Sequence, residues 1–169
     1  MPNHITNIIT IQASEGRTAQ EVIDFVKSDE REFDFNKLIP MPQEIIASFD
    51  TPGISPPWYN WSLEHWGTKW NAYEISVNEN VIRFDTAWSA PFPIFESLHE
   101  KFSDFTFDIK YADEDMGYNF GHFEYMPGKT TSYSLPLEGT PEARVWVCSN
   151  VSGYFPEYID ENGNYIEED

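Results

Sequence analysis

The sequence predicts an α+β fold of the ferredoxin-like type, a split βαβ core in which an antiparallel sheet carries helices on one face. Two observations predict it: β-type alternation of apolar residues recurs along the chain, and amphipathic helical patterns separate the alternating segments in the order β-α-β-β-α-β. In that order each βαβ half places its helix on the same face of one sheet. An insert at residues 33–67 interrupts the first half, and a C-terminal extension follows the core.

The first strand and helix have clear local signals. Residues 5–11 are rich in isoleucine and threonine, which is typical of a strand. Thr18 and Glu21 have the spacing of a capping box, in which each side chain bonds the other residue's backbone N–H. A helical apolar stripe follows at Ala19, Val22, Ile23 and Val26.

The insert cannot hold a long regular element. Five prolines lie between residues 33 and 57, and each one lacks a backbone donor and restricts the residue before it. We expect an extended segment at 33–35, a short helical turn at 43–46 and a second short helix at 58–65. Gly67 is placed to end that helix.

The second half of the core repeats the β-α pattern. Residues 73–77 and 82–86 alternate around the turn 78–80, which predicts an antiparallel hairpin. A helix with Ile94, Phe95, Leu98 and Phe102 on one face follows two prolines. Alternation at 105–111 then predicts the next strand.

The last 43 residues, 127–169, form an acidic extension that we expect to pack on or next to a ferredoxin-like domain at 1–126. Strands at 119–125 and 130–134 would extend the sheet. Thr140 and Pro141 resemble the start of a helix that Gly153 would end, but alternation within 143–147 also fits a strand. The Asn-Gly pair at 162–163 predicts a tight turn.

The charge of the chain excludes one class of function. The chain carries 29 acidic and 10 basic residues, a formal charge of −19, and its bases are scattered. Binding to nucleic-acid backbones needs clustered bases, so we expect no direct nucleic-acid binding. No stretch reaches the roughly 20 apolar residues that cross a bilayer, and no secretory signal is visible. We therefore expect a cytoplasmic protein without membrane contact.

Five phrases carry a family resemblance: MPNHITN at the start, FNKLIPMP from Phe35, WGTKWNAY from Trp66, FDTAWSAP from Phe84 and YADEDMG from Tyr111. In this order they resemble the YubB-type ferredoxin-like domain, over about residues 1–126. That family consists of proteins of unknown function carried by bacterial plasmids and phages. The resemblance implies a ferredoxin-like fold in a mobile-element context and supplies no catalytic residues.

A tryptophan-rich segment is the candidate ligand site. It combines aromatic faces, a cation, a hydroxyl and an amide, which together suit a planar ligand or a nucleotide. The alternative is structural, with the tryptophans in the core and the lysine lying across an indole. The candidate residues are Trp66, Thr68, Lys69, Trp70, Asn71 and Trp88.

Asp113 and Asp115 are candidates for a metal site, because closely spaced carboxylates near a glycine can hold Mg²⁺ or Ca²⁺. A metal-dependent enzyme built on them is one alternative, and a solvated acidic turn is another. No nucleophile motif, phosphate loop or dinucleotide fingerprint is present, so we expect no cofactor and favour a protein without enzymatic activity.

The acidity itself suggests the main hypothesis. Residues 111–169 hold 12 acids and 2 bases, and carboxylate rows can imitate the phosphates of DNA. We expect the protein to bind a basic host protein, a defence or nucleic-acid-handling factor, although the acids also promote solubility. The candidate interaction residues are Asp113, Glu114, Asp115, Asp160, Glu161, Glu167, Glu168 and Asp169.

Overall fold

A computed structural model describes residues 2–167. The core elements are β1 (His4–Gln12), α1 (Ala19–Val26), β2 (Tyr73–Asn78), β3 (Val81–Ala87), α4 (Phe92–Lys101), β4 (Thr106–Asp113), β5 (Phe120–Met126) and β6 (Lys129–Ser132). The insert contains the 3-10 helix η1 (Phe35–Lys37), α2 (Gln43–Ile46) and α3 (Pro57–His65), and the extension contains α5 (Pro141–Val147) and the π-helical turn η2 (Cys148–Ser152).

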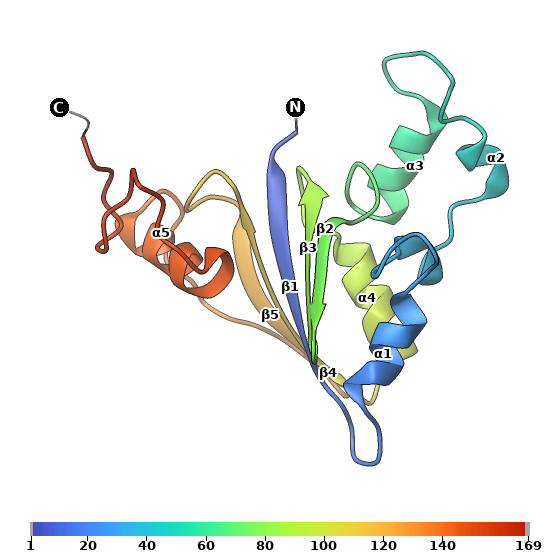
Figure 1. The fold of residues 1–169 in the computed structure, drawn as a ribbon, viewed down its shortest axis with the longest axis horizontal. Helices are drawn as coiled ribbons and strands as arrows, with labels where there is room; N and C mark the ends of the chain where they lie inside the picture. Colours follow the sequence, from blue (N-terminus) through green and yellow to red (C-terminus); the bar gives the residue numbers. More distant parts are fainter. Residues whose placement is uncertain (1, 168–169) are drawn as a thin grey trace.

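The strands form one antiparallel sheet in the order β2-β3-β1-β4-β5-β6. Strand β1 lies between β3 and β4, as a split βαβ core requires. Helices α1 and α4 cover one face of the sheet, and α2 and α3 lie at one end of that helical layer (Figure 1). The ferredoxin-like prediction is therefore confirmed, with β5 and β6 extending the sheet as expected.

The side chains of β1 alternate between the two faces of the sheet, and apolar residues lie on both. Ile5, Ile9 and Ile11 are buried in the large core beneath α1 and α4. Ile8 points the opposite way and packs against a second, smaller core. Because successive side chains of a strand point to opposite faces, this single strand contributes to both cores.

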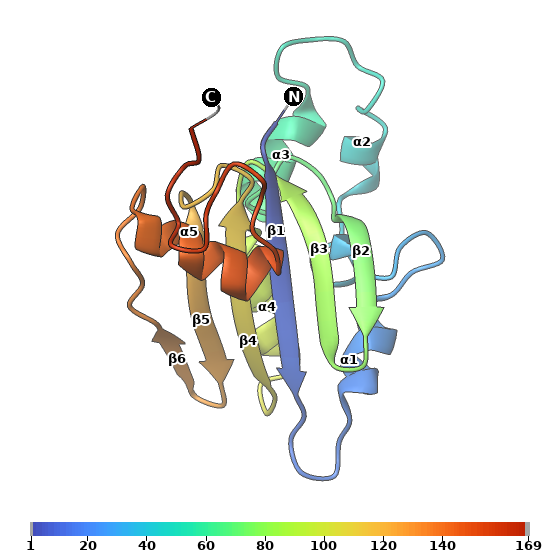
Figure 2. The ribbon, with the colours of Figure 1, turned by 60° about the vertical axis from the view of Figure 1, so that its left-hand side comes forward.

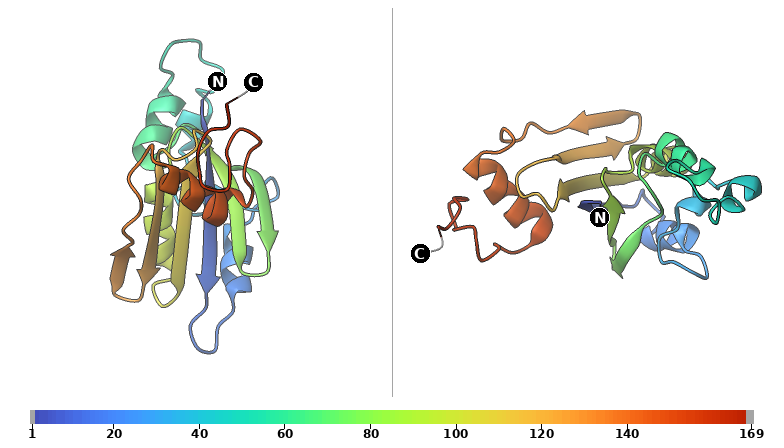
Figure 3. Two further views of the ribbon diagram at one scale, coloured as in Figure 1. Left: turned by 90° about the vertical axis from the view of Figure 1, so that its left-hand side faces the viewer. Right: turned by 90° about the horizontal axis from the view of Figure 1, so that it is seen from above.

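The second core lies between the sheet and the C-terminal extension. Figures 2 and 3 show α5 crossing the face of the sheet opposite α1 and α4. The buried side chains there are Ala112, Met116, Val147, Cys148, Val151 and Ile159. The extension is therefore part of the folded structure, and burial raises the pKa of the Cys148 thiol within it.

The structure decides between the two interpretations of residues 141–151. The segment is helical, and the strand alternative is wrong. The Thr140 hydroxyl accepts a hydrogen bond from the N–H of Ala143, which caps the helix. Gly153, at φ 79°, ends η2 in the left-handed conformation that glycine adopts most readily.

Other local predictions are also tested. Glu21 accepts the backbone N–H of Thr18 at 2.9 Å, which confirms the capping box. The tight turn at 162–163 is confirmed by the bridge between Ile159 and Tyr165 that closes it. The expected extended segment at 33–35 is wrong at Phe35, which begins η1 because the Asp34 carboxylate accepts the next N–H. In the part of the chain that the structure describes, no helix is long and apolar enough to cross a membrane.

Arg144 fastens the end of the extension to α5. Its Nε–H donates to the carbonyl oxygen of Gly163, its Nη1–H donates to that of Gly139 at 3.0 Å, and its guanidinium lies 4.4 Å from the ring centre of Tyr165. A Cβ atom at Gly163 would collide with the carbonyl oxygen of Pro141, so the turn packs tightly on the helix start. Arg144 itself is buried.

Replacing this arginine is expected to loosen the extension and leave the core intact. Arg144→Met removes two hydrogen bonds to backbone carbonyls, and a lost buried partner costs about 1–3 kcal/mol. Amide hydrogen exchange over residues 158–166 should therefore accelerate, while exchange in β1 and β4 stays slow.

Arg17→Met serves as the control, because Arg17 forms exposed ion pairs on the helical side of the sheet. Unchanged exchange at 158–166 in Arg144→Met would contradict the assigned role.

Candidate functional site

Three of the six residues predicted to bind a ligand are held inside the fold. Trp66 donates its indole N–H to the carbonyl oxygen of Ile39 at 2.8 Å, and Thr68 donates its hydroxyl to that of Ala87 at 2.7 Å. Asn71 is buried as well. Their hydrogen bonds connect the loop between α3 and β2 to the insert and to the end of β3.

A buried carboxylate organises this loop. The Oδ1 atom of Asp34 accepts hydrogen bonds from the side-chain amide of Asn71 at 2.8 Å and from the backbone N–H of Asn36 at 2.9 Å. The Oδ1 atom of Asn71 in turn accepts from the backbone N–H groups of Phe35 and Ala72. Burial alone would raise the pKa of Asp34, but the hydrogen bonds to its carboxylate outweigh burial and hold the pKa below its ordinary value.

The other three residues form a partly exposed cluster. The Lys69 ammonium lies 4.4 Å from the ring centre of Trp70 and 4.7 Å from that of Trp88, a cation–π contact on both sides. Trp70 is 36% exposed and Trp88 is 43% exposed. Trp88 also has φ 71°, a strained backbone conformation for a bulky residue, and such strain is concentrated at functional sites.

A hydrogen-bond network joins Trp88 to the acidic loop, which we define as residues 113–115. The Trp88 N–H donates to the carbonyl oxygen of Asn3 at 2.9 Å. The Asn119 amide donates to the carbonyl oxygen of Trp88 at 3.3 Å and to the Asp113 carboxylate at 3.2 Å, and the Asn3 amide donates to Asp113 at 3.0 Å. Two segments that are distant in sequence therefore meet at one end of the central strands β1, β3 and β4.

The three acids of the loop differ in how exposed they are and in how many hydrogen bonds they already accept. Asp113 is buried, and it also accepts the backbone N–H of Asp115. Glu114 is exposed and accepts the N–H of His4 at 2.8 Å, and Asp115 is exposed. A metal ion at Asp113 would have to displace existing hydrogen bonds, and residues 2–167 contain no group of three ligating side chains that could hold one.

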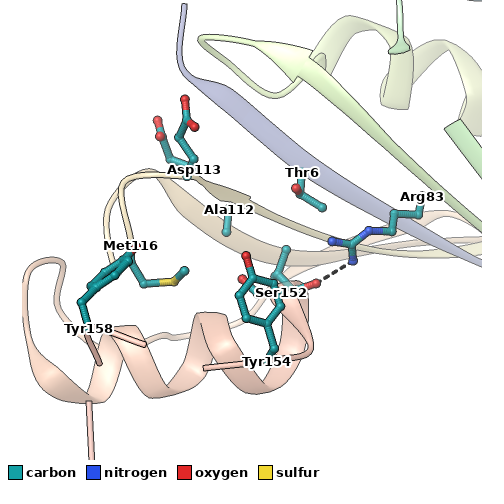
Figure 4. A pocket seen from close by; sticks show the side chains of 10 residues that line it. Thr6, Arg83, Ala112, Asp113, Met116, Ser152, Tyr154 and Tyr158 are labelled. Atoms are coloured by element: carbon teal, nitrogen blue, oxygen red, sulfur yellow. Dashed lines mark hydrogen bonds between the residues drawn. The ribbon is translucent and has the colours of Figure 1, made fainter. Parts of the chain in front are cut away.

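A hollow of about 260 Å³ separates the acidic loop from the extension (Figure 4). Tyr154 and Tyr158 of the extension line one side, and Asp113 and Glu114 line the other. Arg83 also lines the hollow, with one N–H donated to the carbonyl oxygen of Val151 at 2.7 Å. Tyr154 and Tyr158 are 63% and 50% exposed, so both phenol rings are accessible.

The extension carries further acids after Tyr158. Glu114 of the acidic loop and Tyr158 of the extension line the same hollow. Burial, with the neighbouring Tyr154, Tyr165, Cys148 and Asp115, raises the pKa of Tyr158. Asp160 accepts the backbone N–H groups of residues 162 and 164, which lowers its pKa. Glu161 and Glu167 are exposed, whereas Glu168 and Asp169 lie outside the described residues.

We call Glu114, Asp115, Tyr154 and Tyr158 the acidic–aromatic surface. Within residues 2–167, a base lies within 4.0 Å of four carboxylates, those of Glu21, Glu30, Asp104 and Asp108. The acids of the acidic–aromatic surface are therefore not neutralised by neighbours in this part of the chain. Tyr154, Tyr158 and Asn3 were not predicted as site residues from the sequence; the tyrosines interleaved with acids after Gly153 were the available signal.

Comparison with known proteins supports the fold. Residues 65–144, just under half of the chain, match a family described as the ferredoxin-like domain in Api92-like protein. The match runs from the end of α3 into α5 and supports a ferredoxin-like domain. Neither the curated proteins nor the solved structures give a match.

The hydrogen bonds to Asp34 lead us to expect that its contribution to the free energy of unfolding depends on pH. Because its folded-state pKa lies below the ordinary value of 3.8, the ionised form is favoured by folding. The resulting stability is present above pH 3.8 and is lost as pH falls through the lower, folded-state pKa. Asp34→Asn should therefore lower the free energy of unfolding by about 1–2 kcal/mol at pH 7, and the difference from wild type should shrink below pH 3.8.

Urea unfolding at pH 7 and at pH 3, followed by circular dichroism, measures both effects. Asp29→Asn, at an exposed position in the same region, is the control and should match wild type at both values. A difference between Asp34→Asn and wild type that grows on acidification would contradict the prediction.

Proposed function

We propose that this protein acts by binding, and that its acidic–aromatic surface engages a basic protein. One observation carries the proposal: the fold brings the exposed carboxylate of Glu114 and the exposed rings of Tyr154 and Tyr158 around one hollow, and the exposed Asp115 follows Glu114 in the chain. These residues lie in segments about 40 positions apart.

The chemistry of these groups suits lysine and arginine side chains. A guanidinium can pair with a carboxylate while its plane lies against a phenol ring. Aromatic residues dominate the energetics of many protein interfaces, and complementary charge raises the association rate. Trp88, held to Asp113 through Asn119, adds a further exposed ring at the border of the acidic–aromatic surface.

The net charge of −19 supports the same class of partner. Over a whole molecule, such a charge attracts basic proteins at long range and opposes approach to nucleic acid. The resemblance to YubB-type domains favours a partner in the cytoplasm of a bacterial host, a defence or nucleic-acid-handling factor whose basic groove normally faces DNA phosphates. On this proposal the protein competes with DNA as a mimic, without catalysis.

Neutralising the acidic loop is expected to weaken binding more than an equal loss of charge elsewhere. We expect Glu114→Gln with Asp115→Asn to reduce affinity for a nona-arginine peptide roughly tenfold at low salt, because two close charges are lost. Glu44→Gln with Glu100→Gln is the matched control, since it removes the same charge from exposed positions in α2 and α4. Titration calorimetry over a salt series measures both.

The wild-type affinity should fall steeply as salt rises. Equal weakening by the two double variants would show that only net charge matters, and affinity that stays constant up to about 0.5 M salt would contradict an electrostatic interface. A pull-down from bacterial lysate with the same variants then identifies the partner, which the loop variant should fail to retain.

A further inference from the structure

A second hollow lies under the insert, away from the acidic–aromatic surface. It measures about 370 Å³ and is lined by residues of α2, α3 and the loop that follows α3. Trp58, Trp66 and Trp70 supply three indole rings to its walls, and Phe49 stands beside Trp58 with nearly parallel rings 5.3 Å apart. This volume and lining are in the range of small-molecule sites.

The walls are fixed before any ligand binds. The Trp66 indole is hydrogen-bonded to the carbonyl oxygen of Ile39, and its ring packs edge-on against Phe35. The amides of Asn36 and Asn71 also line the hollow, but both are used by bonds within the fold. They shape the wall and are not available as the main polar contacts of a ligand.

Ser62 provides an independent indication of a ligand. It is fully buried and lines the hollow, and its hydroxyl has no hydrogen-bond partner in the described structure. An unpartnered buried hydroxyl costs about 1–3 kcal/mol, so native proteins usually satisfy such a group. A ligand atom that enters between the indoles would supply the missing partner.

Arg31 supplies the positive charge of a lining that also includes Glu30. It is the one base that lines the hollow, and its Nε–H donates to the carbonyl oxygen of Ala72 at 3.3 Å. Its other contact is an ion pair with Glu30 at 3.6 Å, in which both side chains are exposed, and such pairs contribute little. Because only a weak, exposed ion pair occupies the rest of this guanidinium, it can bind a carboxylate through two parallel hydrogen bonds.

The charges of the lining favour a ligand with one negative charge over a doubly charged one. A single arginine beside Glu30, in a chain of charge −19, does not balance a doubly charged phosphate. The flat indole walls favour a planar ring. The buried hydroxyl requires a polar ring atom or substituent.

We propose that this hollow binds an aromatic monocarboxylate, with the ring between the indoles, the carboxylate on Arg31 and a polar ring atom on Ser62. This site is separate from the acidic–aromatic surface and does not depend on the proposed protein partner. It includes Trp66, Trp70 and Asn71, three of the residues that the sequence identified as ligand candidates.

The test uses defined probes with the full-length protein. Indole-3-acetate, 6-hydroxy-2-naphthoate and salicylate are titrated by calorimetry, with indole-3-acetamide as the uncharged analogue and adenosine monophosphate as the doubly charged one. We expect at least one carboxylate to bind about tenfold more tightly than the amide and the nucleotide. Tighter binding of the nucleotide, or binding of no carboxylate below about 1 mM, would overturn the proposal.

Arg31→Gln should remove the preference for indole-3-acetate over its amide, and Lys37→Gln, an exposed base outside the hollow, should leave it unchanged. Retention of the preference in Arg31→Gln would overturn the assignment of the carboxylate to this residue.

Ser62→Ala separates a binding role from a structural role. If the Ser62 hydroxyl bonds the ligand, the variant should bind the best probe at least about fivefold more weakly than wild type. Its melting temperature should be equal to or above that of wild type. Ser48→Ala is the contrast, because the Ser48 hydroxyl is already bonded to Ile45 and Trp58, so that variant should melt lower and bind normally. Unchanged affinity in Ser62→Ala would overturn the role of the hydroxyl.

Discussion

The side chains of β1 that point away from α1 and α4 need cover, and the C-terminal extension provides much of it. In many antiparallel sheets one face packs on the core and the other meets water. Here Ile8 and Ala112 lie on that second face and pack with Val147, Cys148 and Val151. Burial of this small apolar group holds α5 and η2 across the strands, and it therefore determines where the residues after Gly153 can lie.

The position of the extension creates the candidate interface. Tyr154 and Tyr158 follow η2 directly, so docking of η2 on β1 and β4 carries both rings to the side of the acidic loop. Asp113 completes the arrangement because its carboxylate accepts hydrogen bonds from Asn3 and Asn119. A buried, fully bonded acid thus positions the exposed acids next to it, and the two kinds of carboxylate have different tasks within one loop.

The sequence predicted the core well because its signals are local. The run of β-branched residues in β1, the capping box at Thr18 and the Asn-Gly turn each depend on residues a few positions apart. The sites depend on long-range contacts. Asn71 resembled a ligand residue in sequence, yet it bonds Asp34 across 37 positions, and the approach of Tyr158 to Asp115 requires the extension to fold back over the sheet.

The reactivity of Cys148 reports whether the extension is packed on the sheet. The only cysteine of the protein is buried against Met116, and its raised pKa keeps it in the unreactive thiol form. A thiol reagent can modify it only after the extension lifts from the sheet, so the modification rate follows the population of that open state. A partner that binds Tyr154 and Tyr158 would stabilise the closed position of the extension. Modification of Cys148 would then become slower, although the partner does not contact its sulfur atom.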